Sequence, residues 1–444
     1  MNSRNHDLES ESIVRESKDD VVDTTGTSSS ESHSHDAVPR TRYRWRIVAI
    51  WSILLGASVT YMFIFPIARS AIDAWQPVDQ GPVLEELTLG ESIRLRSSEF
   101  FVVFWIFAVG ASLGSFLNVV AGRMNQGTSI SGSSRCSSCN ARIRRWDLIP
   151  ILAWFTLGGR CRTCHVEISP RYPFVEALTA GIFLLLLFVE LLSGCANVPF
   201  KRHYFHDGFV WIIFYPKWDV VGTYAYHMTL LCFLLVMSLI QWERARIPRR
   251  LVLTGLGLGA LVAAISPTLQ PVAWLKHYPD WLAHWSWLER IDTTLAGLVV
   301  GACLGTVLKT AMFSNTQTAK SQRRYAPETA SMILVGVYLG WQAALSIAVF
   351  TALFLICAVV IARRWPQITN MPASGWILLA TILHICLWSS LTDWPLWPGP
   401  HSSVVSISMS CVGVVATCTL ARLLSRKSRV ANLINLELGE GVPS

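Results

Sequence analysis

Four cysteines in two closely spaced pairs are the residues of this sequence best suited to chemistry. Cys136 and Cys139 form the first pair, and after 21 intervening residues Cys161 and Cys164 form the second. Each Cys-x-x-Cys hook presents two thiolates from a tight turn, and four thiolates at tetrahedral positions suit Zn²⁺. Four sulfur ligands leave no open position for water, so the metal is predicted to be structural rather than catalytic. A bound metal is favoured over free thiols, because the spacing is that of a metal site and disulfides are unlikely in a cytoplasmic compartment. His165 is a fifth candidate ligand, although four cysteines already complete the shell.

Three arginines, Arg142, Arg144 and Arg145, follow the first hook. One interpretation is a solvated face that also serves as a signal for membrane topology. The other is attraction to anionic lipid headgroups or to a substrate. The sequence leaves both interpretations open.

The composition indicates that these residues belong to a membrane protein. Of 444 residues, 52% are hydrophobic and 15% are charged, which is too few polar residues to cover a soluble surface of that size. The chain is predicted to be an all-α polytopic membrane protein with about ten transmembrane helices and a small zinc-ribbon-like loop. The segment 331–362 is counted as two short helices because Gly336, Gly340 and Trp341 offer a break. The apolar runs lie at 47–65, 100–121, 173–193, 222–240, 251–267, 293–308, 331–340, 342–362, 374–391 and 402–422.

The basic residues indicate the orientation of these helices. The formal net charge is +8, but the arginines and lysines form short clusters beside apolar runs, which is typical of membrane topology and not of a nucleic-acid surface. With ten spans and both ends inside, the inner segments hold roughly three times as many basic residues as the outer ones. This pattern predicts a multi-pass membrane protein whose two termini and four-cysteine loop are cytoplasmic.

The segments around the cysteines resemble the N-terminal half of the type IV prepilin peptidases. The motifs that carry the resemblance are Gly114-Ser-Phe-Leu-Asn-Val-Val120 with Arg123 and Met124, the two hooks, and Ile168-Ser-Pro-Arg-Tyr-Pro-Phe-Val-Glu176. A weaker match continues through Ile247-Pro248, the glycines 297, 301 and 305, and Gly336-Val-Tyr-Leu-Gly-Trp-Gln342. The resemblance covers roughly residues 100–391.

Domain boundaries follow from the resemblance and the composition. Residues 1–43 are polar and are expected to be disordered. An additional N-terminal helix and an outer loop (44–99) precede the first core helix (100–122), the zinc loop (123–171) and the remaining core helices (172–391). An additional C-terminal helix (392–422) and a cytoplasmic tail (423–444) complete the chain.

The resemblance implies an aspartic endopeptidase that acts on type IV pilin-like or pseudopilin precursors. Such enzymes cut a leader from the precursor at the cytoplasmic membrane face, and the bifunctional members methylate the new N-terminus with S-adenosylmethionine. Two aspartates activate the water, one as base and the other as acid. The implied partners are therefore the precursor and the lipid bilayer.

The two aspartate positions of the family are occupied by other residues in this chain. Gln241 stands at the first position and Glu328 at the second, where Pro327 replaces a glycine. A glutamine cannot ionise, so this pair lacks a second carboxylate. Glu243 could be recruited, but in a helix it would be turned about 200° away from Gln241.

Two intramembrane carboxylates are further candidates, because charges inside a membrane are costly. Glu176 is expected either to pair with Arg171 near the start of a helix or to take part in chemistry, and Glu190 lies near the far end of the same span.

Two classes of function remain open. The first is a prepilin peptidase that cuts, or only methylates, its precursor. The second is a non-catalytic paralogue that binds pilin-like segments or scaffolds a pilus or secretion platform. A transporter or sensor ranks last, because the spans hold few charges that could line a pathway.

Overall fold

The structure is a computed structural model whose described part is almost entirely helical. It describes residues 40–75, 88–199, 209–266, 269–270, 272, 286–312, 326–362, 364–365, 371–394, 397–398 and 404–439. Within these ranges the β-type pairings are single bridges, Arg135 with Arg142 and Arg160 with Glu167. The all-α class is confirmed.

Each of the ten predicted apolar runs overlaps a helix of the described part. Within the described residues, eight helices are long and apolar enough to cross a membrane. Two further helices, α8 with 17 residues and α10 with 13, are shorter. The helices are α1 (Arg40–Val59), α2 (Phe65–Trp75), α3 (Leu89–Gln126), α4 (Leu152–Leu157), α5 (Arg171–Leu186), α6 (Val210–Phe214), α7 (Trp218–Trp242), α8 (Arg249–Ile265), α9 (Ser286–Met312), α10 (Pro327–Leu339), α11 (Trp341–Ile361), α12 (Ala373–Thr392) and α13 (Val404–Gly439). Short π-helical turns η1 (Thr60–Ile64) and η3 (Leu187–Leu191) join α1 to α2 and extend α5, and a 3₁₀ turn η2 (Arg145–Leu148) precedes α4.

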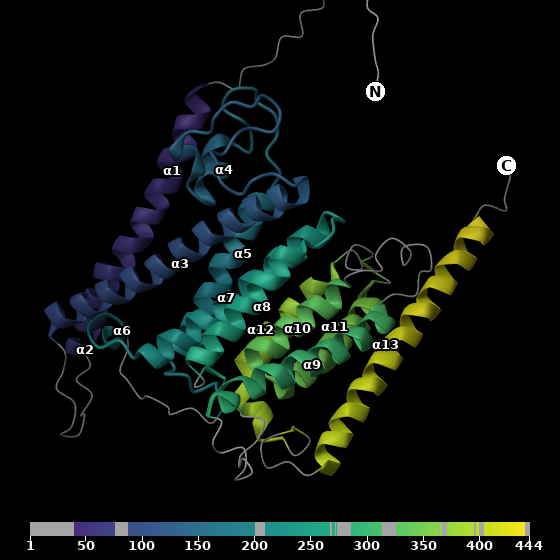
Figure 1. The fold of residues 1–444 in the computed structure, drawn as a ribbon. Coiled ribbons are helices and arrows are strands. Elements are labelled where there is room, and N and C mark those ends of the chain that lie inside the picture. The colour runs from purple at the N-terminus through teal and green to yellow at the C-terminus, as the bar shows by residue number, and fades with distance from the viewer. Residues whose placement is uncertain are drawn as a thin grey trace, which may run out of the picture.

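The core lies where α7 and α10 pass through the middle of the bundle (Figure 1). The rings of Tyr226 on α7 and Tyr338 on α10 stack with centroids 4.6 Å apart. Their hydroxyls donate to the backbone oxygens of Gly259 and Gly255 at 3.1 and 3.2 Å, which ties α8 to both helices. Because each hydroxyl donates a hydrogen bond to a backbone oxygen, neither is left unsatisfied in the apolar core.

Glycines decide how α9, α10 and α11 meet. Gly340 separates α10 from α11 with φ 86° and ψ 171°, a conformation open essentially to glycine alone, so the prediction of two helices in 331–362 is confirmed. A Cβ added to Gly297 on α9 would lie 1.9 Å from the carbonyl oxygen of Gly336 on α10. The glycine pattern of α9 therefore permits close backbone packing against α10.

At three places the helices extend beyond the predicted apolar runs. α3 begins at Leu89, within the predicted outer loop, where Thr88 and Glu91 form a capping box, and it ends at Gln126. α13 continues to Gly439 through most of the predicted C-terminal tail, and α1 begins at Arg40. Of the predicted disordered tail, 1–43, residues 1–39 lie outside the described part, and so do residues 440–444.

One end of the bundle gathers the features that the charge pattern placed together. The four-cysteine loop, the start of α1 and the C-terminal end of α13 lie at this end (Figure 1). We call it the loop end. α7 ends and α12 begins at the loop end, so Gln241, Glu243 and Ser374 also lie there.

Candidate functional site

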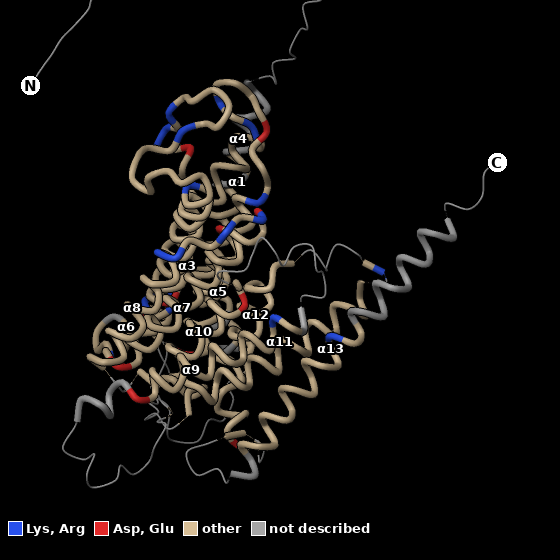
Figure 2. Tube along the Cα trace, turned by 45° about the vertical axis from the view of Figure 1, so that its right-hand side comes forward, with Lys and Arg blue, Asp and Glu red and all other residues tan. Residues whose placement is uncertain are grey.

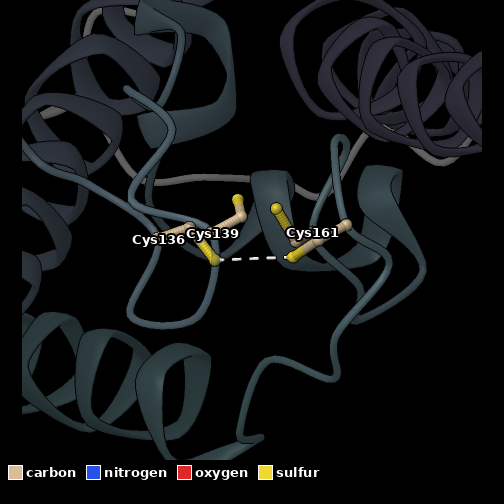
Figure 3. Close-up of side chains that lie close together, drawn as sticks. Cys136, Cys139 and Cys161 are labelled. Carbon is tan, nitrogen blue, oxygen red and sulfur yellow. Dashed lines mark hydrogen bonds between the residues drawn. The ribbon is translucent and has the colours of Figure 1, made fainter. Parts of the chain in front are cut away.

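Four sulfur atoms converge in the loop between α3 and α5. The Sγ atoms of Cys136, Cys139, Cys161 and Cys164 all lie within 4.8 Å of one another, and those of Cys136 and Cys164 are 3.7 Å apart. Figure 3 shows that the three labelled cysteines direct their sulfur atoms into one small space between the hooks. Four sulfurs at about 2.3 Å from a central zinc ion would lie about 3.8 Å apart. The predicted metal-capable cluster is confirmed, and its geometry fits tetrahedral Zn²⁺.

The two hooks share one backbone design. The N–H of Cys136 donates to the carbonyl oxygen of Ala141 at 3.0 Å, and the N–H of Cys161 donates to that of Val166 at 2.8 Å. The residue after each hook, Asn140 or His165, has a left-handed backbone with φ 54° or 58°. His165 is thus the turn residue of the second hook. It is not one of the metal ligands, because the metal-capable group among the described side chains consists of the four cysteines.

The thiols of the cluster differ in acidity. Backbone N–H groups of Cys139 and Ser138 point at the Cys136 sulfur and lower the pKa of this thiol to about 6. The N–H of Val166 favours the Cys164 thiolate, yet desolvation and the neighbouring thiols raise the pKa of Cys164 to about 11. A second thiolate is disfavoured beside the first, and a bound cation would remove that repulsion.

Glu176 attaches the loop to α5. Its Oε2 atom accepts a hydrogen bond from the N–H of Ile151 at 2.6 Å. Ile151 has φ 63° and ψ −58°, a tight turn that is rare and strained for a β-branched residue. The expected pairing of Glu176 with Arg171 is wrong, because Arg171 is the first residue of α5 and reaches Glu243 at the end of α7 instead. The alternative, direct chemistry by Glu176, stays a prediction.

Gln241 connects α7 to α12. Its Oε1 atom accepts hydrogen bonds from the backbone N–H of Ser374 at 3.0 Å and from the Ser374 hydroxyl at 2.7 Å. Ser374 is the second residue of α12, so the amide satisfies a backbone donor that has no partner within the helix. The Gln241 side chain therefore works as a helix cap.

Glu243 connects three helices at the loop end. It follows the last residue of α7, and its Oε1 accepts from Nη1 of Arg171 on α5 at 2.5 Å. Its Oε2 accepts from Nδ2 of Asn125 on α3 at 2.8 Å. In keeping with the turn expected between positions 241 and 243, Gln241 and Glu243 reach different helices. Arg171 and Asn125 were missed as site residues, because nothing local in the sequence pairs them with Glu243.

Glu328 is the second residue of α10 and is fully buried. Neither of its carboxylate oxygens has a hydrogen-bond partner among the described residues. Lys309 on α9 lies close enough to attract its charge. Glu328 thus forms no hydrogen bond to Gln241 or Glu243, and the three candidate catalytic residues are not joined into one hydrogen-bonded group.

A buried polar cluster lies toward the end of the bundle opposite the loop end. Oε1 of Glu190, in η3, is 2.5 Å from Nδ1 of His227 on α7, and both side chains are fully buried. His384 on α12 is fully buried too, with its ring 5.1 Å from that of Trp388. The sequence alone did not identify these histidines, because they lie on two separate helices and no spacing relates them to Glu190.

Comparison with known proteins identifies the family. Residues 108–190, which include both hooks and Glu176, match the Bacterial Peptidase A24 N-terminal domain. A prepilin leader peptidase/N-methyltransferase of Pseudomonas aeruginosa is 30% identical over 240 residues, which are 47% of this chain and 71% of that protein. The chain belongs to the prepilin leader peptidase/N-methyltransferase family. The resemblance found in the motifs is confirmed.

Other members of this prepilin peptidase family match over shorter stretches. A prepilin leader peptidase/N-methyltransferase of Myxococcus xanthus is 46% identical over 88 residues, which are 20% of this chain and 26% of that protein. One from Stutzerimonas stutzeri is 34% identical over 173 residues, which are 38% of this chain and 50% of that protein. The chain thus spans between a quarter and a half of these two relatives. No solved structure matches the chain.

Proposed function

We propose that this protein engages type IV pilin-like precursors at the cytoplasmic face of the inner membrane. The observation that carries the proposal is the four-cysteine loop, which matches the N-terminal domain of the family and is joined to α5 through Glu176. The names of the relatives supply the substrate class, since they are prepilin leader peptidases. The excess of basic residues at the loop end supports a cytoplasmic position for that end and for both termini.

The contacts at the loop end favour recognition of the precursor without aspartic proteolysis. A carboxylate dyad needs one ionised and one protonated carboxyl within reach of the same water. Gln241 cannot ionise, and its amide oxygen is occupied by Ser374. Glu243 is held by Arg171 and Asn125, which leaves Glu328 as a lone carboxyl. The function best supported is therefore that of a precursor-binding paralogue in a pilus or secretion platform.

Leader cleavage or methylation is the second candidate. The names of the relatives favour it, and the methyl donor would be S-adenosylmethionine. Glu328 would then act with a carboxyl that closes on it when the precursor binds.

The four cysteines would hold a structural zinc ion that keeps the loop folded. Because the four sulfurs complete its shell, zinc would offer no position to an attacking water.

Co-expression with a tagged pilin-like precursor tests the proposal. The same precursor is expressed with the Pseudomonas aeruginosa relative, to establish that its leader can be removed. We expect uncut precursor to co-purify with the wild-type chain, with unchanged intact mass. Leader loss that disappears in Glu328→Ala would establish the second candidate instead. Absence of both capture and cleavage would refute engagement of precursors altogether.

A gain-of-function variant sharpens the test. Gln241→Asp combined with Glu328→Asp restores carboxylates of the family's length at both positions. If the fold still brings these positions together, the double variant should trim the precursor that the wild type only binds.

A further inference from the structure

The arginines of the four-cysteine loop divide into two groups. Of the eight arginines in 123–171, five donate to backbone oxygens or pair with acids: Arg123, Arg135, Arg160, Arg162 and Arg171. The other three, Arg142, Arg144 and Arg145, are exposed, and their side chains have no hydrogen-bond or ion-pair partner among the residues that the structure describes. Structural roles within the loop therefore account for the first group and not for the second.

An exposed tryptophan accompanies the three free arginines. Trp146, in η2, is 80% exposed, and Leu148 in the same turn is 42% exposed. Trp154 of the same loop behaves differently, because its Nε1 donates to the carbonyl oxygen of Ile168 at 2.9 Å and its ring packs beneath Gly159. An indole exposed to water leaves apolar surface unburied, which is unfavourable, whereas arginine beside tryptophan is typical of a membrane interface.

We call Arg142, Arg144, Arg145, Trp146 and Leu148 the Arg–Trp patch. Its positive charge is not offset locally, because the one acid beside it, Asp147, is paired with Arg162 at 2.5 Å. Figure 2 shows the basic segments gathered on the loop that carries α4. The patch therefore combines an unneutralised positive field with exposed apolar side chains.

The membrane is the partner that the placement of the patch favours. The loop is tethered to membrane helices at both ends, α3 and α5, and α4 contacts α1, whose C-terminal part begins a further membrane span. Tethering keeps the bilayer surface at a high effective concentration, so weak contacts suffice for docking. An acidic soluble protein would have to bind the patch from solution, in competition with the tethered bilayer surface.

We propose that the Arg–Trp patch docks on anionic phospholipid headgroups of the bilayer that the chain spans, with Trp146 entering the interface. The arginines attract the headgroups, and the indole and Leu148 bury apolar surface among the acyl chains. Each arginine near an anionic surface contributes about fivefold to binding, and three together contribute on the order of a hundredfold. The proposal does not depend on whether the protein engages or cuts a precursor.

Photo-crosslinking of the full chain in vesicles tests the proposal. The chain carrying Trp146→benzoylphenylalanine is reconstituted in phosphatidylcholine alone or in phosphatidylcholine mixed with phosphatidylglycerol. We expect lipid adducts at position 146 in the mixed vesicles, with a yield lower in phosphatidylcholine alone by at least about tenfold and up to the hundredfold of the binding contribution. The matched control, Trp154→benzoylphenylalanine, should crosslink to the protein in both.

Charge variants in the same background separate electrostatics from folding. R142Q/R144Q/R145Q should lower the lipid yield about as much as removal of phosphatidylglycerol does, and R142K/R144K/R145K should retain it. Equal zinc content in all variants shows that the hooks remain folded. Lipid adducts that are absent from both vesicle types, or a full yield in the glutamine variant, would overturn the proposal. Adducts at position 146 to another protein would also overturn it and assign the patch to a protein partner.

Discussion

Removal of the ion pair between Arg171 and Glu243 should loosen the junction at which α3, α5 and α7 meet. Glu243 lies just beyond α7 and accepts hydrogen bonds from Arg171 of α5 and Asn125 of α3. The variant Glu243→Gln keeps the side-chain size, Arg171→Gln shortens the side chain, and each removes one charge. Both are expected to destabilise the fold, and the pair of changes should cost less than the sum of the single ones.

The size of this coupling follows from the exposure of the pair. The atoms Nη1 and Oε1 are 2.5 Å apart, and the side chains are 28% and 26% exposed. Exposed ion pairs contribute about 0.2–1 kcal/mol, and well-shielded hydrogen bonds to charged groups contribute about 1.5–3 kcal/mol. A pair that is partly exposed should lie between these limits, with a coupling energy of about 1–1.5 kcal/mol.

A double-mutant cycle measures this energy directly. The free energy of unfolding is determined in mixed micelles for wild type, both single variants and the double variant. The control pair is Arg160 with Glu167, which is 3.6 Å apart with Glu167 84% exposed, so its coupling should be close to zero. A coupling for Arg171 and Glu243 no larger than that of the control would refute the assigned junction.

Three further predictions concern the metal, the helix packing and the loop anchor. Cys139→Ser should reduce the zinc content measured by atomic absorption, whereas Cys232→Ser, outside the cluster, should leave it unchanged. Gly297→Leu should lower the free energy of unfolding by about 3 kcal/mol or prevent assembly, because the added Cβ would lie 1.9 Å from the Gly336 oxygen. Glu176→Gln should weaken the bond to the Ile151 N–H by about 1–2 kcal/mol and speed amide hydrogen exchange in the turn around it.

Each of these predictions has a contrary result. Full zinc content in Cys139→Ser would exclude this thiol as a ligand. A Cβ added to Gly181 would meet no atom within 4 Å, so Gly181→Ala serves as the packing control, and equal stability of both glycine variants would contradict the close helix contact. Unchanged exchange in Glu176→Gln would show that the carboxylate does not hold the turn.

The sequence alone determined the class of the protein and the cysteine cluster, because both depend on local patterns. Apolar runs of membrane length predict helices without knowledge of their neighbours. Each Cys-x-x-Cys hook is built by hydrogen bonds within six residues, so its two thiolates are positioned by the hook itself. The break at Gly340 was also visible, since a glycine beside a tryptophan interrupts the longest apolar run.

Only the tertiary structure decided what the candidate catalytic residues contact. Gln241 meets Ser374 across 133 positions of sequence, and Glu243 meets Arg171 across 72. A membrane helix that is apolar on all sides carries no stripe to specify its neighbours, so such long-range pairs leave no periodic signal. The same limit explains the error at Glu176, for which a near neighbour in sequence was preferred to a backbone donor 25 residues away. Packing of small residues, such as Gly297 against Gly336, selected which helices meet and thereby which polar side chains face one another.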